Sequence, residues 1–375
     1  MKPFFKTCLT LGLGLSLLYG CKKKEEPAPA TSPSPSTPAP TINSVPTDGD
    51  FVLFVKNEQI YWTRDFVSTF LYNSSIKEVR RIWRSGDTLL FTIATDQATE
   101  RLYYGSIHKP QEFKYVTSDF FTIYQAGIIN GVITGEGLKG GSHYRFYCNV
   151  KEGASNLAQL DVNPVFLTFF NHTGKSVIAG AFMETDTKFL YTLNGKDWIQ
   201  RPMPTSTLPE VVIQAKSATV LGNFFYDKTY TTTDTSFQNW TERSNNFFMD
   251  SAGYMSGPYT YNQDMLYRIG YYTVNATTYR KLVLFSKSIN DNNWTGTKIV
   301  ATGFLSELGH DKNIVLALFT NSHSALILQD LNTIDNKSTY SLWLSSDRIN
   351  YTKNNLSSDA VNDYLIDMYS AINFD

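Results

Sequence analysis

Residues 176–199 read SVIAGAFMETDTKFLYTLNGKDWI. Two short apolar runs, Ser176 to Phe182 and Phe189 to Thr192, flank a polar turn, and Asn194-Gly195 forms a second tight turn before Trp198. Short apolar runs separated by turn residues at this density predict antiparallel β-strands in a meander. Because no stretch of the chain has a convincing helical period, the sequence predicts an all-β fold.

The same pattern recurs along the chain. Seven times an aromatic residue on an apolar run has a small residue close beside it, at intervals of 39 to 58 residues. The pairs are Trp62-Thr63, Tyr104-Gly105, Tyr147-Cys148, Tyr191-Thr192, Tyr230-Thr231, Phe285-Ser286 and, more loosely, Trp343 with Ser345. Most of these intervals have the length of one four-stranded propeller blade, and the last two have room for an extra loop. We therefore predict a seven-bladed β-propeller with four-stranded antiparallel blades over residues 49–375.

The two ends of this region predict how the propeller closes. The first repeat shows strands over Phe51 to Val55, Ile60 to Thr63 and Phe70-Leu71, and it lacks an innermost strand. The run from Tyr364 to Tyr369 is apolar and is left over after the seventh repeat. Because a closed fold must pair its ends or expose sheet edges, we expect this C-terminal run to be the missing strand of the first blade.

A short motif follows the aromatic strand in four of the seven repeats. It reads Ser or Thr, any residue, then Asp or Asn, with an aromatic residue shortly after. A short carboxylate or amide can accept hydrogen bonds from N–H groups further along the turn, while the aromatic side chain packs between sheets. The motif residues are Thr63, Asp65 and Phe70; Thr192, Asn194 and Trp198; Thr232, Asp234 and Trp240; and Ser345, Asp347 and Tyr351.

This motif resembles the Asp-box of sialidase-like, or BNR-repeat, β-propellers, and the resemblance covers about residues 50 to 375. In that family the Asp-box is a structural element at the blade periphery. The resemblance therefore implies that these acidic residues stabilise turns and are not catalytic.

The N-terminal segment is typical of an exported lipoprotein. Lys2 and Lys6 precede an apolar stretch from Leu9 to Leu18, and residues 1–20 read as a signal peptide that ends before Cys21. This stretch is too short to span a bilayer comfortably as a helix. It resembles a bacterial lipobox, which implies lipidation of Cys21 and anchoring of the protein to a membrane by lipid.

The residues after Cys21 predict a tether and a location. Lys22 to Glu26 resembles the export tag of Bacteroidetes surface lipoproteins, and a solvated charge run is the alternative. Pro27 to Pro46 holds seven of the 14 prolines, so residues 21–48 are expected to form a disordered Pro-rich linker. We expect an outer-membrane lipoprotein at the cell surface, with a periplasm-facing location as the alternative.

The charge and the His and Cys content of the chain limit the classes of ligand and partner that we expect. The formal net charge of −1 gives no field that would attract nucleic acid. The five His residues lack ligand spacing, so the sequence indicates neither a metal site nor a cofactor. Cys148 is the one thiol left once Cys8 and Cys21 are assigned to the signal and the anchor, and we expect it to be a buried small residue in a monomeric protein.

Catalytic constellations are not recognisable in the sequence. Sialidase-like catalysis implies three arginines that converge from separate blades, but Arg80, Arg81 and Arg84 are crowded on one segment whose side chains alternate between faces. Glu136 in a Gly-rich hairpin, and Glu307 with His310 and Asp311, are polar groups that we interpret mainly as loop residues. A pair of carboxylates facing a channel stays open as an enzymatic alternative.

These patterns favour a non-catalytic lipoprotein that binds a glycan or a protein. We expect the binding face near the long sixth and seventh repeats, because exposed aromatic residues can stack on sugars or anchor a partner. The candidate stacking residues are Tyr259, Tyr261, Tyr271 and Tyr272. A sialidase-like hydrolase or lyase, and an envelope assembly or scaffold factor, are the alternatives.

Overall fold

The computed structural model describes much of the chain after residue 40. The chain divides into residues 1–39 and residues 40–375, and every described residue belongs to the second unit. Description covers residues 41–369 except 96–97, 152–157, 161–165, 173–175, 183–187, 205–210, 215–217, 223–228, 244–253, 256–259, 263–264, 276–278, 292–294, 299–309, 321 and 349. The predicted signal peptide, Cys21 and most of the Pro-rich linker therefore lie outside the described residues.

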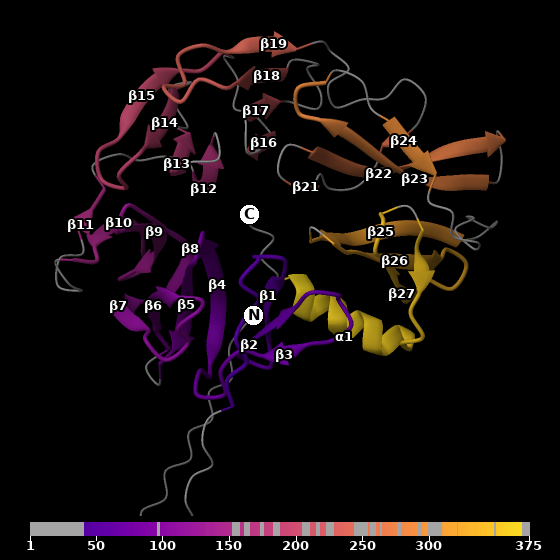
Figure 1. The fold of residues 1–375 in the computed structure, drawn as a ribbon, viewed down its shortest axis with the longest axis horizontal. Helices are drawn as coiled ribbons and strands as arrows, with labels where there is room; N and C mark the ends of the chain where they lie inside the picture. Colours follow the sequence, from indigo (N-terminus) through magenta and orange to yellow (C-terminus); the bar gives the residue numbers. More distant parts are fainter. Residues whose placement is uncertain are drawn as a thin grey trace, which may run out of the picture. The chain divides into compact units, whose positions relative to one another are not determined.

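The described strands form seven antiparallel sheets in chain order, as Figure 1 shows. Sheet 1 has β1 (Val52–Lys56), β2 (Gln59–Thr63) and β3 (Phe70–Leu71); sheet 2 has β4 (Val79–Ser85), β5 (Thr88–Ala94), β6 (Glu100–Ser106) and β7 (Lys114–Phe120). Sheet 3 has β8 (Thr122–Ile129), β9 (Val132–Lys139), β10 (Ser142–Asn149) and β11 (Ala158–Gln159); sheet 4 has β12 (Phe166–His172), β13 (Ser176–Phe182), β14 (Lys188–Thr192) and β15 (Ile199–Pro202). Sheet 5 has β16 (Val211–Gln214), β17 (Thr219–Gly222), β18 (Thr229–Thr232) and β19 (Thr241–Arg243). Sheet 6 has β20 (Tyr254–Met255), β21 (Thr260–Asn262), β22 (Met265–Asn275), β23 (Tyr279–Ser288) and β24 (Thr295–Lys298); sheet 7 has β25 (His310–Phe319), β26 (Ser324–Asn332), β27 (Lys337–Ser345) and β28 (Thr352–Lys353).

Each sheet is a meander in which strands adjacent in sequence pair with each other, apart from β20 and β21, which both pair with β22. The predicted all-β fold is confirmed, and the strands expected in the first repeat and in residues 176–192 lie within a residue or so of the observed ones. In sheet 3, Asn130-Gly131 joins β8 to β9 at one end, and Gly140-Gly141 joins β9 to β10 at the other. We call the first the turn end and the second the hairpin end.

Hydrophobic clusters lie between consecutive sheets. Leu90 and Leu102 of sheet 2 pack with Ile133 and Phe146 of sheet 3. Sheets 1 and 2 share a second cluster, in which Leu53 and Ile60 pack with Leu89 and others. Cys148 is buried in the cluster of sheets 2 and 3, as the sequence predicts. The fold is therefore a series of small sheets that bury their faces against their neighbours in the chain.

The first and last sheets also pack together. Val52 and Phe54 of β1 lie in one cluster with Leu318, Ile327 and Leu342 of sheet 7. We call this contact the seam. The C-terminal helix α1 (Ser358–Tyr369) contributes two further residues of the cluster, Val361 and Leu365, and it contacts both β1 and β27.

The predicted closing strand is wrong, because residues 358–369 form this helix. Ser357 caps its N-terminus by accepting a hydrogen bond from the N–H of Ala360 at 3.3 Å, and Asp359 lies in the first turn, where a negative charge is favourable. Val361 and Leu365 are four residues apart, so they share the buried face. Sheet 1 keeps three strands among the described residues, and these correspond to the second, third and fourth strands of the other sheets.

Candidate functional site

The recurring turn has a shared hydrogen-bond pattern, which is clearest after β2. One carboxylate oxygen of Asp65 accepts hydrogen bonds from the N–H groups of Val67 and Ser68 at 2.9 and 2.7 Å. The hydroxyl of Thr63 accepts from the N–H of Phe66 at 2.9 Å. Burial of the Asp65 carboxyl acts to raise its pKa, but the hydrogen bonds from Ser68 and Val67 outweigh burial and hold the pKa below its ordinary value.

The same contacts recur after β14, β18 and β27. Asn194 accepts from the N–H groups of Lys196 and Asp197, and Asp347 accepts from the N–H of Asn350. Asp234 accepts from the hydroxyl and the N–H of Ser236, which hold the pKa of Asp234 well below its usual range. Each of these side chains accepts its hydrogen bonds from groups of its own turn.

In each turn, the described residues include one in the left-handed region of the backbone. Phe66, Gly195 and Arg348 follow the acid or amide directly, with φ of 61°, 79° and 61°, and Phe237 has φ of 52° three residues after Asp234. Bulky residues rarely adopt this conformation, so packing must compensate for the strain. Phe66 is buried in the seam cluster.

Phe237 shows the same packing between sheets 4 and 5. Its ring lies 4.7 Å from that of Phe189 and 4.8 Å from that of Tyr191, both in β14. Trp240 packs edge-on against Phe189 at 5.9 Å, which is the position between sheets predicted for the motif aromatic. Tyr351 is also buried, with its hydroxyl 2.9 Å from that of Ser324, and Trp198 is half-buried.

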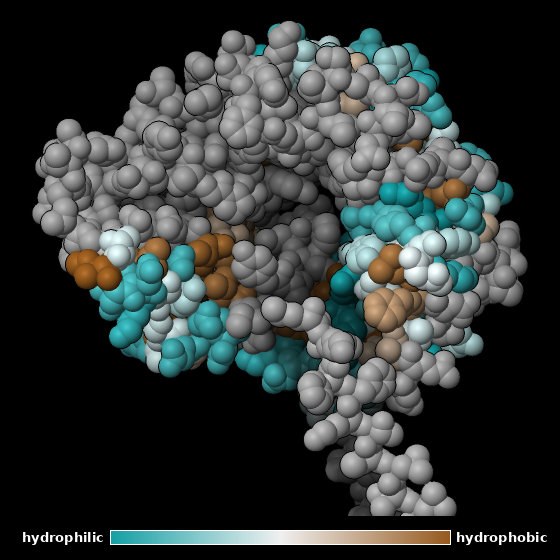
Figure 2. Space-filling view, turned by 180° about the vertical axis from the view of Figure 1, so that it is seen from behind, coloured by the Kyte–Doolittle hydropathy of each residue, from teal (hydrophilic) through white to brown (hydrophobic). Residues whose placement is uncertain are grey.

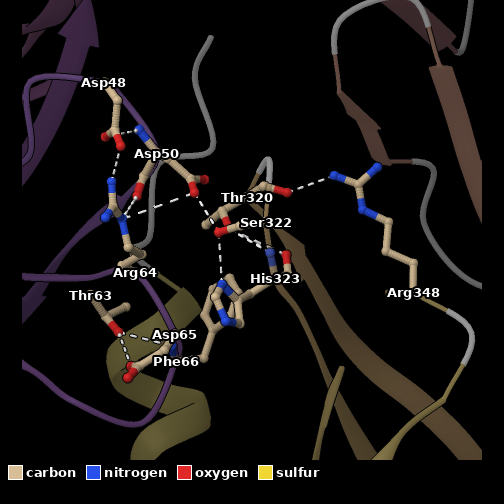
Figure 3. A network of polar contacts seen from close by, with 10 residues as sticks. All are labelled: Asp48, Asp50, Thr63, Arg64, Asp65, Phe66, Thr320, Ser322, His323 and Arg348. Carbon is tan, nitrogen blue, oxygen red and sulfur yellow. Dashed lines mark hydrogen bonds and ion pairs between the residues drawn. The ribbon is translucent and has the colours of Figure 1, made fainter. Parts of the chain in front are cut away.

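A polar network joins the chain before β1 to the loop between β25 and β26 (Figure 3). Ser322 donates a hydrogen bond to the carboxylate of Asp50 and lies 2.7 Å from Nδ1 of His323. Arg64 forms an ion pair with Asp48 and donates to the backbone carbonyl of Asp50 at 3.1 Å. The network therefore holds the turn end of the seam.

Ser322, His323 and Asp50 do not form a nucleophilic triad. In a triad the imidazole lies between the serine and the carboxylate, so that the carboxylate orients the base. Here the Asp50 carboxylate contacts Ser322 itself, and His323 is bound on the far side of the hydroxyl (Figure 3). We interpret these contacts as structural.

A second cluster lies at the hairpin end of sheets 2 and 3. We call it the Tyr124 site and define it as Arg81, Tyr124, Glu136, His143 and Arg145. The rings of Tyr124 and His143 are stacked, with centroids 5.7 Å apart and planes at 18°. The guanidinium carbon of Arg81 lies 5.6 Å from the Tyr124 ring. Tyr124 is 40% exposed and the His143 side chain 41%, so both aromatic groups are accessible.

A largely buried ion pair, Glu136 with Arg145, lies next to this exposed pair. Glu136 is 8% exposed, and its Oε2 lies 3.3 Å from Nε of Arg145 and 3.9 Å from Nε2 of His143. Glu136 and Arg145 are directly opposite in the pairing of β9 with β10, so both side chains lie on one face of sheet 3. His143 lies two residues before Arg145 in β10, so its side chain is on the same face of sheet 3 as Glu136 and Arg145.

Two contacts from sheet 2 fix the start of β8. Glu100 of β6 is buried and accepts hydrogen bonds from the N–H of Ile123 at 2.9 Å and from the hydroxyl of Thr122 at 3.1 Å. Arg81 of β4 donates to the carbonyl of Ile123 at 2.6 Å. These bonds hold both backbone groups of the residue before Tyr124, so the ring is carried on a rigid base.

A β-bulge places Tyr124 off the regular ladder. Ile123 pairs with Gly137 and Gln125 with Glu136, so Tyr124 is the additional residue in β8. Such bulges re-aim side chains and are frequent beside binding sites. Sequence reasoning missed Tyr124 and His143, because the bulge depends on strand pairing; the only local signal was the aromatic-rich start of the strand.

The predicted stacking residues lie elsewhere. Tyr259 is outside the described residues, while Tyr261 lies in β21 and Tyr271 and Tyr272 lie in β22. Of the other sequence candidates, Glu307 lies outside the described residues, and His310 and Asp311 are the first residues of β25.

The three crowded arginines separate as predicted. Arg80 pairs with Glu58 at 2.8 Å, whereas Arg84 lies over the ring of Phe51 at 4.7 Å. Only Arg81 reaches the Tyr124 site. Within the described part of the chain, no three His, Cys, Asp or Glu side chains gather as a metal site. None of the described helices has the length and apolar character needed to cross a membrane.

Comparison with known proteins shows similarity of fold only. No family model and no curated protein matches this chain. A post-proline cleaving enzyme from Rickettsia typhi is similar in structure with a TM-score of 0.50 and 11% identity, over 82% of this chain and 52% of the enzyme, so the chain spans about half of that enzyme's length.

Two further solved structures are less similar. The β-propeller domain of the trilobed protease from Pyrococcus furiosus has a TM-score of 0.45 and 9% identity, over 76% of this chain and 84% of that domain. Streptogramin B lyase has a TM-score of 0.42 and 13% identity, over 84% of this chain and 93% of the lyase. The structural neighbours of this all-β chain thus include β-propeller proteins.

Proposed function

We propose that this protein is a lipid-anchored, seven-bladed β-propeller at the bacterial outer membrane that binds a glycan at the Tyr124 site without chemical turnover. Seven consecutive sheets in the described residues, each packed on the next where a contact is described, support the propeller. The lipobox-like segment before Cys21 and the Pro-rich linker support the anchor. The Asp-box-like turns are its structural elements.

The stacked and exposed Tyr124–His143 pair carries the glycan hypothesis. The apolar face of a pyranose ring packs on aromatic side chains, and its hydroxyl groups need hydrogen-bonding partners at the rim. Tyr124 supplies a ring and a hydroxyl, and His143 supplies a ring and a polar nitrogen. Since Glu100 and Arg81 bond both backbone groups of Ile123, the strand that carries Tyr124 loses little conformational entropy on binding.

Hydrophobic residues are scattered over the surface that Figure 2 shows, where those in the described part form small patches among hydrophilic ones. Broad apolar patches are typical of tight protein interfaces, and small ones are ordinary. A sugar that covers one or two exposed aromatic residues matches this distribution better than a large protein partner.

Binding is favoured over catalysis by the contacts of Glu100 and Glu136, the two buried carboxylates next to the Tyr124–His143 pair. Glycoside hydrolysis uses one carboxyl group as an acid and another as a base or nucleophile, both facing the sugar. Glu100 is bonded to the backbone and hydroxyl of β8, and Glu136 lies against Arg145. Neither arrangement presents a carboxyl group to a ligand.

The proposal is tested by a glycan array with the full-length lipoprotein in detergent. Tyr124→Ala should lower the apparent affinity for the bound glycans at least about tenfold, which is 1.4 kcal/mol. Tyr115→Ala is the matched control, because Tyr115 is 60% exposed but lies near the start of β7, toward the turn end. An array without any bound glycan, or equal signals from wild type and Tyr124→Ala, would refute glycan binding at this site.

The anchor has a separate test. Mass spectrometry of the intact protein from membranes should show a mass consistent with an N-terminal lipidated Cys21 and loss of residues 1–20. Cys21→Ala should leave the unlipidated precursor. An unmodified Cys21 on an uncleaved wild-type chain would contradict lipid anchoring and leave the glycan hypothesis intact.

A further inference from the structure

The two arginines of the Tyr124 site differ in their partners. Nε of Arg145 lies 3.3 Å from the carboxylate of Glu136, whereas no carboxylate of the described residues forms an ion pair with Arg81. The guanidinium of Arg81 donates from Nη1 to the carbonyl of Ile123 at 2.6 Å. Because a guanidinium has five N–H donors, others on Arg81 stay available to a ligand.

The acidic residues next to Arg81 have other partners. Both carboxylate oxygens of Glu100 accept hydrogen bonds from the start of β8. Glu136 lies against Arg145 on the opposite strand of its own sheet. In the described part of the chain, the charge of the half-buried Arg81 side chain is therefore not neutralised by direct contact with a carboxylate.

This charge lies beside the two exposed rings. The guanidinium carbon of Arg81 is 5.6 Å from the centroid of the Tyr124 ring, which in turn stacks with His143. Arg81 belongs to β4 of sheet 2, and the other members of the site belong to sheet 3, so the two sheets supply different chemistry. A sugar ring in contact with Tyr124 has its substituents within reach of the guanidinium.

A carboxylate is the substituent that matches a guanidinium best. Its two oxygens are coplanar and accept parallel N–H groups from the guanidinium fork, and these charge-assisted hydrogen bonds are stronger than neutral ones. The hydroxymethyl group of a neutral hexose offers one hydroxyl and no charge. Arg81 should therefore distinguish an acidic sugar from the neutral sugar of the same shape.

We propose that the ligand of the Tyr124 site is an acidic glycan, in which a pyranose carboxylate pairs with Arg81 while the ring contacts Tyr124 and His143. This inference rests on the proposed glycan binding and adds the charge of the ligand and a residue that determines specificity. Arg81 then has two roles, since it holds the carbonyl of Ile123 and selects the carboxylate.

The test is a glycan array that presents oligosaccharides of galacturonic, glucuronic and mannuronic acid, each beside its carboxyl-reduced neutral form, followed by titration calorimetry of the bound pairs. The full-length protein in detergent should bind at least one acidic form about tenfold, or 1.4 kcal/mol, more tightly than its neutral form. This ratio should fall as salt is added, because mobile ions screen a partly exposed ion pair.

Two neighbouring arginines provide the variant and its matched control. Arg81→Gln should bring the ratio of acidic to neutral affinity close to one. Arg80→Gln should leave the ratio unchanged, because the Arg80 side chain is 50% exposed and already pairs with Glu58 at 2.8 Å. Melting temperatures of both variants show whether the fold is retained.

The ratio separates selection of the carboxylate from support of the strand. If Arg81 only holds Ile123, Arg81→Gln weakens acidic and neutral forms by the same factor, and this result overturns the inference. Equal affinities of the wild type for both forms, or Tyr124-dependent array binding of neutral glycans when none of the acidic series binds, overturn the inference alone. Absence of any bound glycan on the array overturns both the inference and the proposed function.

Discussion

Substitution of Phe66 by Ala tests whether the seam stabilises the fold. Phe66 is fully buried in the cluster that joins sheet 1 to sheet 7, although it belongs to a surface turn. Truncation of a buried Phe to Ala costs about 3–5 kcal/mol through lost burial and the cavity left behind. Ala regains nothing from the backbone, since it is also strained at φ of 61°.

Urea unfolding of wild type and Phe66→Ala gives the free energy of unfolding from the midpoint and the slope. We expect a loss of about 3–5 kcal/mol, a large share of the 5–15 kcal/mol of a typical domain. Val67→Ala is the control in the same turn, because Val67 is 56% exposed and should change stability by less than about 0.5 kcal/mol.

Hydrogen exchange shows which strands Phe66→Ala destabilises. Loss of the Phe66 ring should speed exchange in β1 and β2 and in β26 and β27, and leave sheet 3 unchanged, because contacts at the seam open together. Phe237→Ala should act in the same way on sheets 4 and 5. A loss below about 1 kcal/mol for Phe66→Ala, or faster exchange confined to its own turn, would refute the role of the seam.

Three further substitutions test the turns, the buried lysine and the support of the site. Hydrogen bonds from Ser236 hold the pKa of Asp234 below its usual value, so its stabilising contribution is fully present above about pH 4 and declines as the pH falls below that. Asp234→Ala should cost about 1 kcal/mol at pH 7 by urea unfolding and less at pH 2, and an equal cost at both pH values would contradict this assignment. Burial of Lys287, with Arg243 nearby, lowers its pKa to about 7 from 10.5, so its charged form opposes folding below pH 7 and the penalty disappears as the pH rises toward 10.5. Lys287→Met should therefore raise the free energy of unfolding by about 2–4 kcal/mol at pH 6 and by much less at pH 10, and a pH-independent difference would exclude this explanation. Glu100→Ala should weaken glycan binding about tenfold, or 1.4 kcal/mol, because the start of β8 loses its acceptor, and Glu100→Gln should restore most of the affinity; calorimetric affinities that do not distinguish the three proteins would show that Glu100 does not position the site.

The strands and turns were predictable because they depend on local chemistry. The alternation and turn residues of residues 176–199 determine a meander by themselves. The Thr63-Arg64-Asp65 turn forms its hydrogen bonds within a few residues, so its contacts can be read from the motif. In the described part of the chain, sheet 1 has no strand before β1, in agreement with the abrupt start at Phe51.

The C-terminal helix was mispredicted because its apolar run is short. Tyr364-Leu365-Ile366 fits a strand as well as one side of a helix, and periodicity cannot separate these for short runs. The deciding signals were the cap at Ser357 and the spacing of Val361 from Leu365, which become decisive only when the seam is known.

The candidate site was missed for a different reason. Long sixth and seventh repeats suggested binding loops, but much of the extra length is strand, since β22 and β23 have 11 and 10 residues. Tyr124 owes its position to a bulge in β8 and to Glu100 and Arg81 of the neighbouring sheet. Contacts between sheets leave no regular spacing in the sequence.

The seam has a consequence for biosynthesis. Asp50 and Ser322 are 272 residues apart, whereas each sheet is assembled from strands that follow one another directly. At about 5–20 residues per second, the apolar side chains of β1 leave the ribosome tens of seconds before those of sheet 7. During that interval Val52, Phe54 and Phe66 lack their final neighbours, so we expect the first sheet to complete its packing only after sheet 7 has been synthesised.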